Sequence, residues 1–116
     1  MNNLQVTARY KIYSGKAAEF KKLAEECIPI VKGKDKDTLQ YDWYLNDEQT
    51  ECVLRETYPD SKALLVHLGN IGDLFGKLIA LGDFSAEIYG KPSDDLLNAI
   101  RGLDIKVYSF YQGIGA

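Results

Sequence analysis

Hydrophobic and polar residues alternate along four short segments of the chain, which is the pattern of β-strands with one buried face. In the first segment the apolar positions fall on one face, and they are Leu4, Val6, Ala8, Tyr10 and Ile12. A fifth strand is expected close to the C-terminus. The expected strands span residues 4–13, 38–46, 51–58, 83–89 and 105–111.

Between the first two strands, apolar residues recur at intervals of three and four, which predicts an amphipathic helix over residues 16–32. Pro29 lies in the last turn of this helix and is expected to bend or end it. The run of alternating charges over residues 32–37 then predicts a solvated loop. The apolar stripe of the helix is Phe20, Leu23, Cys27 and Val31.

A second helical stretch covers residues 61–81 and begins at the start signal Pro59-Asp60-Ser61. Glycine is a poor helix former, so three glycines are expected to divide this stretch into two short helices with a bend near residues 69–72. Ser93 is expected to cap a short third helix, because its hydroxyl can accept a hydrogen bond from the first turn. The three glycines are Gly69, Gly72 and Gly76.

The predicted order of elements is βαββαβ, followed by one more helix and one more strand. Two βαβ halves that share one antiparallel sheet, with the helices on a single face, form a ferredoxin-like α+β fold. A chain of 116 residues has room for one such unit, so residues 1–116 are assigned to a single domain.

Charge and composition argue against two kinds of partner. The chain has 14 basic and 17 acidic residues, spread evenly over both halves, so no basic face for nucleic acid is expected. The apolar stretches are much shorter than the roughly 20 residues of a membrane span, and no signal peptide opens the chain. We therefore expect a cytoplasmic protein that binds neither nucleic acid nor a membrane.

The residues that hold metals and cofactors are sparse. Two cysteines, Cys27 and Cys52, and one histidine, His67, are too few for a zinc site built from Cys and His ligands. The cysteines are expected to be reduced packing residues. The glycines fit neither a phosphate-binding loop nor a dinucleotide fingerprint. The sequence therefore predicts no metal and no cofactor.

Two ionisable residues fall on faces that the pattern predicts to be buried. Glu56 shares a strand face with Cys52, Leu54 and Tyr58, where desolvation would raise its pKa toward that of a general base. The alternative is an edge strand, from which Glu56 reaches water or a lysine. His67 lies on the inward helical stripe, where a neutral imidazole can remove a phenolic proton. The alternative for His67 is a satisfied boundary residue.

Four aromatic residues share the helix-facing sides of their strands and would form a flat slot for an aromatic ligand. The alternative is an aromatic core. Asn70 is a further candidate, which either presents its amide to this pocket or ends a helix. The four aromatic residues are Tyr10, Tyr41, Trp43 and Phe84.

Several segments resemble the antibiotic biosynthesis monooxygenase family, in its small quinol-monooxygenase-like branch. They are LQYDWYLN, RETYPDSKALLVHL, NIGDLFGKL and EIYGKPSDDL, and the resemblance covers roughly residues 4–112. It implies a ferredoxin-like chain that pairs sheet to sheet as a dimeric α+β barrel, with a pocket between the sheet and the helices of each subunit. Several members of this family oxidise phenols or hydroquinones with molecular oxygen and use neither a metal nor a flavin.

The resemblance also implies roles for individual residues. Tyr58 stands where the family typically has a tryptophan that lines the pocket, and Glu56 and His67 match a glutamate and a histidine of the family. A cousin branch that degrades haem has an asparagine in the first strand and a tryptophan in the third. This chain has Ala8 and Tyr58 at those positions, which disfavours haem degradation, although His67 alone remains a candidate haem ligand.

The leading hypothesis is a cofactor-independent monooxygenase that acts on a quinol or another hydroxylated aromatic. Glu56 or His67 would accept the proton, and Tyr58, Trp43 and Tyr41 would hold the ring. Oxygen needs only a dry, apolar cavity next to the resulting anion. The alternative is a non-catalytic dimeric protein that binds a small apolar ligand, and a third reading is a haem-binding protein.

The opposite faces of the strands predict a second surface, rich in tyrosine and arginine. Its charges are mixed, with Arg9 and Arg55 against Asp42 and Glu87, so the face can complement its own copy across a two-fold axis. We expect a homodimer through this face, and the alternative is a solvated surface. The face comprises Gln5, Thr7, Arg9, Lys11, Tyr13, Gln40, Asp42, Tyr44, Val53, Arg55, Thr57, Ser85, Glu87 and Tyr89.

Overall fold

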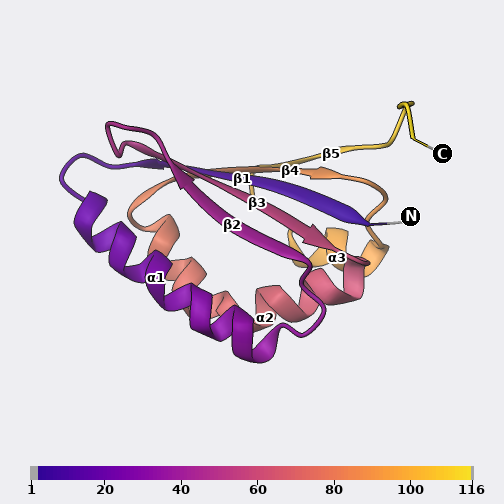
Figure 1. Cartoon of the computed structure of the whole chain (residues 1–116), viewed down its shortest axis with the longest axis horizontal. Coiled ribbons are helices and arrows are strands. Elements are labelled where there is room, and N and C mark those ends of the chain that lie inside the picture. Colours follow the sequence, from indigo (N-terminus) through magenta and orange to yellow (C-terminus); the bar gives the residue numbers. More distant parts are fainter. Residues whose placement is uncertain (1–2, 116) are drawn as a thin grey trace.

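Strands and helices follow one another in the predicted order in a computed structural model, which describes residues 3–115 (Figure 1). The strands are β1 (Leu4–Ile12), β2 (Gln40–Leu45), β3 (Glu51–Tyr58), β4 (Gly82–Tyr89) and β5 (Ile105–Tyr108). The helices are α1 (Ala17–Lys34), α2 (Ser61–Ile79) and α3 (Asp94–Ala99).

The five strands form one sheet in the order β2-β3-β1-β4-β5. The first four are antiparallel to their neighbours, as predicted, but β5 runs parallel to β4, with Ala86 opposite Ile105. The prediction of a wholly antiparallel sheet is therefore wrong at this edge. The reason is the connection: α3 carries the chain back to the end of the sheet where β4 began, and a strand that follows such a crossover must be parallel.

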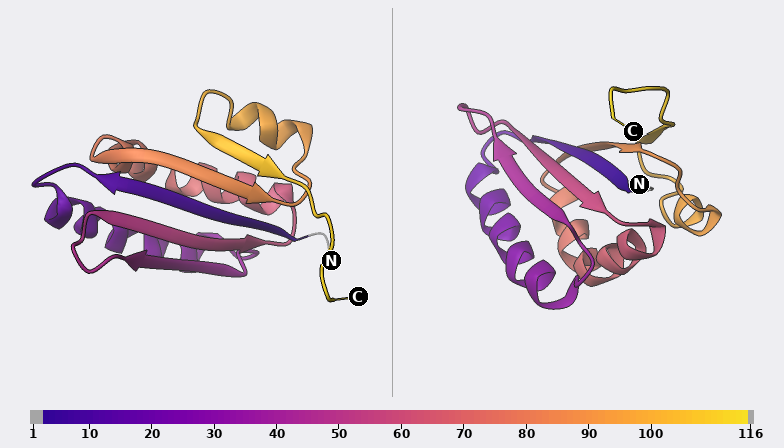
Figure 2. Two further views of the ribbon diagram at one scale, coloured as in Figure 1. Left: turned by 90° about the horizontal axis from the view of Figure 1, so that it is seen from above. Right: turned by 45° about the vertical axis from the view of Figure 1, so that its right-hand side comes forward.

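The helices cover one face of the sheet, and the other face carries no helical layer in the described part of the chain (Figures 1 and 2). Two buried clusters lie between the layers. One holds Phe20 and Cys27 of α1 with the C-terminal half of α2, and the other holds the first turns of α2 with Leu96 of α3. The predicted α+β, ferredoxin-like arrangement is confirmed.

Helix α2 is a single helix, and the predicted division near residues 69–72 is wrong. A Cβ atom built on any of its three glycines would meet nothing within 4 Å, so these glycines serve no close approach. Leu64, Ile71 and Leu78 are buried along one stripe that spans the glycines. The burial of this stripe outweighs the poor helix propensity of the glycines, which costs about 1 kcal/mol for each glycine. The predicted start is confirmed, since Asp60 accepts a hydrogen bond from the backbone of Ala63 at 2.9 Å.

The sequence predicts that Pro29 bends or ends helix α1. The helix runs through Pro29 and ends at Lys34, so the proline does not end it. Cys27 and Val31 are buried on either side of the proline and anchor both turns. The predicted solvated loop over residues 32–37 is wrong at Asp35, which is only 6% exposed. None of the helices within residues 3–115 combines the length and the apolar character that a membrane span requires.

Candidate active site

Glu56 lies in the interior of the sheet, because β3 is hydrogen-bonded to β1 on one side and to β2 on the other. Its register neighbours are Val6 and Tyr41. The side chain is 7% exposed on the face that the helices cover. The predicted burial is confirmed, and the alternative of an edge strand is wrong.

His67 projects from α2 toward this carboxylate and is 2% exposed. Its Nε2 atom lies 3.8 Å from Glu56 Oε1. The imidazole ring packs against two tyrosine rings, with centroid distances of 5.0 Å to Tyr41 and 5.4 Å to Tyr58. The predicted inward position of His67 is therefore confirmed, and both tyrosines pack against its ring.

Asp35 is a residue of the candidate site that the sequence pattern did not predict. Its carboxylate is hydrogen-bonded to His67 Nδ1 and accepts Asn70 Nδ2 at 2.5 Å and Thr38 Oγ1 at 3.3 Å. A carboxylate can only accept, so the proton of a neutral His67 lies on Nδ1 and its Nε2 carries a free lone pair. Asp35 thus acts on His67 as the buried aspartate of a catalytic triad acts on its histidine.

Tyr58 supports Glu56 from the other direction. Its hydroxyl donates to Glu56 Oε1 at 2.6 Å. Burial raises the pKa of Glu56, against the opposing effects of His67 and of the Tyr58 hydrogen bond. Burial and the neighbouring Glu56 also raise the pKa of Tyr58, which therefore remains a hydrogen-bond donor.

The two sides of this site have different environments. His67 is oriented by the carboxylate of Asp35, while Glu56 sits on an apolar face where the neutral acid is favoured. A neutral imidazole and a carboxyl whose neutral form is favoured can serve as a proton acceptor and a proton donor. The arrangement can therefore take up a proton at His67 Nε2 and deliver one from Glu56.

A cavity of about 60 Å³ lies between the sheet and α2, beside these two residues. Its lining is almost wholly apolar apart from Glu56 and His67. This volume holds a few water molecules and is far too small for haem. Tyr10, Tyr41, Trp43 and Phe84, the four aromatic residues predicted to form a slot, all line it.

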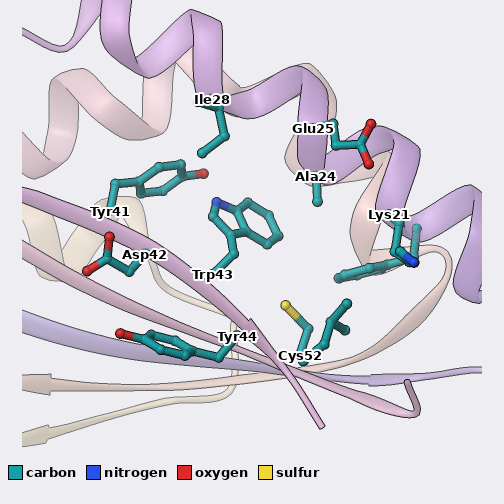
Figure 3. A pocket seen from close by; sticks show the side chains of 11 residues that line it. Lys21, Ala24, Glu25, Ile28, Tyr41, Asp42, Trp43, Tyr44 and Cys52 are labelled. Atoms are coloured by element: carbon teal, nitrogen blue, oxygen red, sulfur yellow. The ribbon is translucent and has the colours of Figure 1, made fainter. Parts of the chain in front are cut away.

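A wider groove opens between α1 and β2, with a volume of about 680 Å³ (Figure 3). Tyr41 and Trp43 line both this groove and the inner cavity. Figure 3 shows Trp43 projecting from β2 toward α1, with its ring beside Tyr41 and facing Ile28. Trp43 Nε1 is buried and has no hydrogen-bond partner among the described residues. Leaving such a donor unpaired costs about 1–3 kcal/mol.

Two of the predicted binding residues do not line the inner cavity. Tyr58 is fully buried behind Glu56, and Asn70 bonds to Asp35. Both therefore act on the ionisable residues rather than along the cavity wall. The structure brings Asn70 and His67 together on Asp35, which no pattern in the charged run around Asp35 could indicate.

The two cysteines are free and buried, as predicted. Burial raises the pKa of the Cys52 thiol to about 12, and it raises the pKa of Cys27 as well. Neutral thiols are poor nucleophiles. Neither cysteine is therefore a candidate nucleophile, and Glu56, His67 and Asp35 remain the candidate residues of the site.

Replacement of Glu56 by glutamine is expected to change how stability depends on pH. The folded-state pKa of Glu56 is raised, so the unfolded chain loses this proton first as the pH rises above about 4.3. From there up to the folded-state pKa, ionisation favours the unfolded state and wild-type stability is lost. Urea unfolding from pH 4 to 8 should show Glu56→Gln gaining stability relative to wild type with rising pH.

Glu48→Gln is the matched control, because Glu48 is an exposed residue of the loop between β2 and β3. Its stability should follow that of the wild type at every pH. A constant difference between wild type and Glu56→Gln across the range would contradict a raised folded-state pKa for Glu56.

Solved structures share this fold, although no protein-family model and no curated protein matches the chain in sequence. MupZ from Pseudomonas fluorescens is 21% identical, with a TM-score of 0.79 over 100% of this chain and 96% of its own. A proposed antibiotic biosynthesis monooxygenase from Caulobacter crescentus is 22% identical, with a TM-score of 0.70 over 79% of this chain and 92% of its own.

A mutant of SnoaB, a cofactor-independent oxygenase from Streptomyces nogalater, is 14% identical, with a TM-score of 0.66 over 80% of this chain and 96% of its own. At sequence identities this low, the similarity supports a conclusion about the fold alone. The chain has the fold of the antibiotic biosynthesis monooxygenases.

Proposed function

We propose that this chain, which has the fold of the antibiotic biosynthesis monooxygenases, oxidises a quinol or another hydroxylated aromatic with O₂ and without a cofactor. The observation that carries the proposal is the Asp35–His67 pair. His67 lines a small, largely apolar cavity. A positioned imidazole is the most frequent general base in enzymes. An anion formed in a dry cavity keeps its full reactivity toward oxygen.

The reaction begins when His67 Nε2 takes a phenolic proton. The resulting anion gives an electron to O₂, and the two radicals combine as a peroxide on a ring carbon. Loss of water from the peroxide leaves a hydroxyquinone, so one oxygen atom enters the ring and the other leaves as water. The quinol supplies all four electrons. The carboxyl of Glu56, whose neutral form burial favours, is our candidate for the acid that assists the departing oxygen.

Oxygen uptake by the purified protein tests this proposal. A panel of hydroquinones under air should include at least one that is oxidised well above its rate in buffer, with one O₂ consumed per hydroxyquinone. We expect the protein to be colourless and free of stoichiometric metal. Stoichiometric iron, copper or flavin would overturn the cofactor-free mechanism.

A redox-neutral proton transfer is the second candidate, favoured by the juxtaposition of Glu56 and His67 Nε2 at 3.8 Å. An acid beside a base suits an isomerisation or an internal addition, which consumes no oxygen. An assay under nitrogen distinguishes the two candidate functions. Oxidation should stop there, whereas proton transfer should continue, and stoichiometric binding without turnover in either gas would favour the non-catalytic alternative.

We further propose that the chain acts as a cytoplasmic homodimer through the face of the sheet that no helix covers. Tyr44 and Tyr89 are exposed on this face, at 55% and 38%. Arg9 pairs with Glu87 at 3.4 Å, while none of the ion pairs within residues 3–115 includes Arg55. Arg55 and Asp42 are register neighbours on β3 and β2, so a second copy can offer each a charged partner.

Arg55→Glu is expected to weaken the dimer at least about tenfold, because it places like charges near the two-fold axis. Sedimentation velocity at micromolar concentration measures the change. Lys62→Glu is the matched control, since Lys62 is exposed on α2, on the helical side of the sheet, and it should leave association unchanged. If the wild-type protein sediments as a 13 kDa monomer, the dimer proposal is wrong and this face is a solvated surface.

A further inference from the structure

The inner cavity is too small for the ring that the proposed function places in it. Its volume is about 60 Å³, whereas an engineered protein cavity that binds benzene has about 150 Å³. The groove between α1 and β2 is about 680 Å³, within the usual range for small-molecule sites. Any ligand that reaches His67 must therefore occupy space beyond the inner cavity.

The groove and the cavity meet at one wall. Tyr41 and Trp43 line both spaces, and no other residue among 3–115 does. Both side chains come from β2, an edge strand of the sheet with one neighbour, β3. Displacement of the Trp43 ring would join the two spaces, and it would disturb the sheet least at this edge.

The chemistry of the groove indicates what fills it. Its apolar lining includes Phe20, Ala24, Ile28 and Leu45 together with Trp43. Figure 3 shows the charged side chains of Lys21 and Glu25 projecting from α1 beside it. The exception in this apolar lining is Trp43 Nε1, a buried donor that has no hydrogen-bond partner in the described part of the chain. An apolar substituent fits the groove, and an oxygen atom on the ligand would satisfy the indole N–H.

We propose that the groove and the inner cavity form one binding site for an elongated ligand, a phenolic ring that carries an extended hydrocarbon substituent. The substituent lies between α1 and β2, and the ring passes Trp43 to bring its hydroxyl to His67 Nε2. The phenolic end rests on the proposed function, whereas the groove end rests on the volumes and on Trp43. In this proposal the Trp43 side chain separates the two spaces in the free protein and moves aside when the ligand binds.

Two phenols that differ only in a hydrocarbon chain provide the test. Resorcinol and 4-hexylresorcinol are titrated into the protein by calorimetry and by fluorescence excited at 295 nm, where the signal comes from Trp43, the one tryptophan of the chain. Burial of six carbons should make 4-hexylresorcinol bind at least about 10²-fold more tightly. Its binding should also shift the Trp43 emission.

A filled groove should remove this preference. Ala24→Phe places a ring in the groove, and it should weaken 4-hexylresorcinol binding about tenfold or more. Ala18→Phe is the matched control, the same substitution at an exposed position of the same helix outside the groove, and it should leave the affinity unchanged. Equal affinity of the two phenols, or equal effects of the two variants, would overturn the proposal.

A failure of the groove proposal can be distinguished from a failure of the proposed oxidation. A chain-length preference that Ala24→Phe abolishes, without oxygen uptake from any quinol, would leave the groove site standing and overturn the oxidation. Oxygen uptake without a chain-length preference would do the reverse.

Discussion

Replacement of His67 by alanine is expected to lower the rate of quinol oxidation by about 10²–10⁴-fold, the usual contribution of a positioned general base. Glu56 has the role of the acid in the proposed reaction. The tyrosines of the cavity offer no second base, because burial raises the pKa values of Tyr10 and Tyr41 and they stay protonated. Oxygen uptake by wild type and variant, at saturating quinol, measures the effect.

His67→Asn is the companion variant, since its amide nitrogen can still donate to Asp35. It should fold as well as the wild type by circular dichroism and lose as much activity as His67→Ala. If either variant retained the wild-type rate with a verified substrate, His67 would have no part in the proton transfer.

Asp35→Asn is expected to lower the same rate by about 10²-fold or more, although Asp35 lies behind His67 and outside the cavity lining. The asparagine amide can donate to Nδ1, which moves the ring proton to Nε2 and removes the lone pair that faces Glu56. Asp35 is therefore a positioning residue. The variant also loses the carboxylate oxygen that accepts from both His67 Nδ1 and Thr38 Oγ1, a cost of about 1–3 kcal/mol in the free energy of unfolding.

Asp37→Asn is the matched control, an exposed aspartate two residues further along the same loop. It should keep both the rate and the stability of the wild type. An Asp35→Asn protein that is destabilised but fully active, with an unchanged pH–rate profile, would show that Asp35 serves the fold alone.

Alternation along the strands was sufficient to place Glu56 correctly, because a residue's face in a sheet depends only on counting by two. The position of His67 likewise followed from its place between Leu64 and Ile71 on the helical stripe. Both are local properties. The core of the site was therefore predictable from sequence, as were the four aromatic residues around the cavity.

Asp35 was not predictable, because it lies in a run of alternating charges that is typical of solvated loops. Its burial comes from a contact with His67, 32 residues away in sequence, and no local pattern contains that information. The parallel β5 was missed for a similar reason, since the direction of a strand depends on its connection. The continuity of α2 through its glycines depends on packing, which overrides local propensity.

The hydrogen-bonding state of the His67 ring tests the central claim most directly. The chain has one histidine, so a long-range ¹H–¹⁵N correlation spectrum of labelled protein contains a single imidazole. In the neutral ring we predict a protonated Nδ1 and an unprotonated Nε2 in the wild type, and the opposite in Asp35→Asn. A wild-type ring with its proton on Nε2 would contradict the account, because no lone pair would then face Glu56.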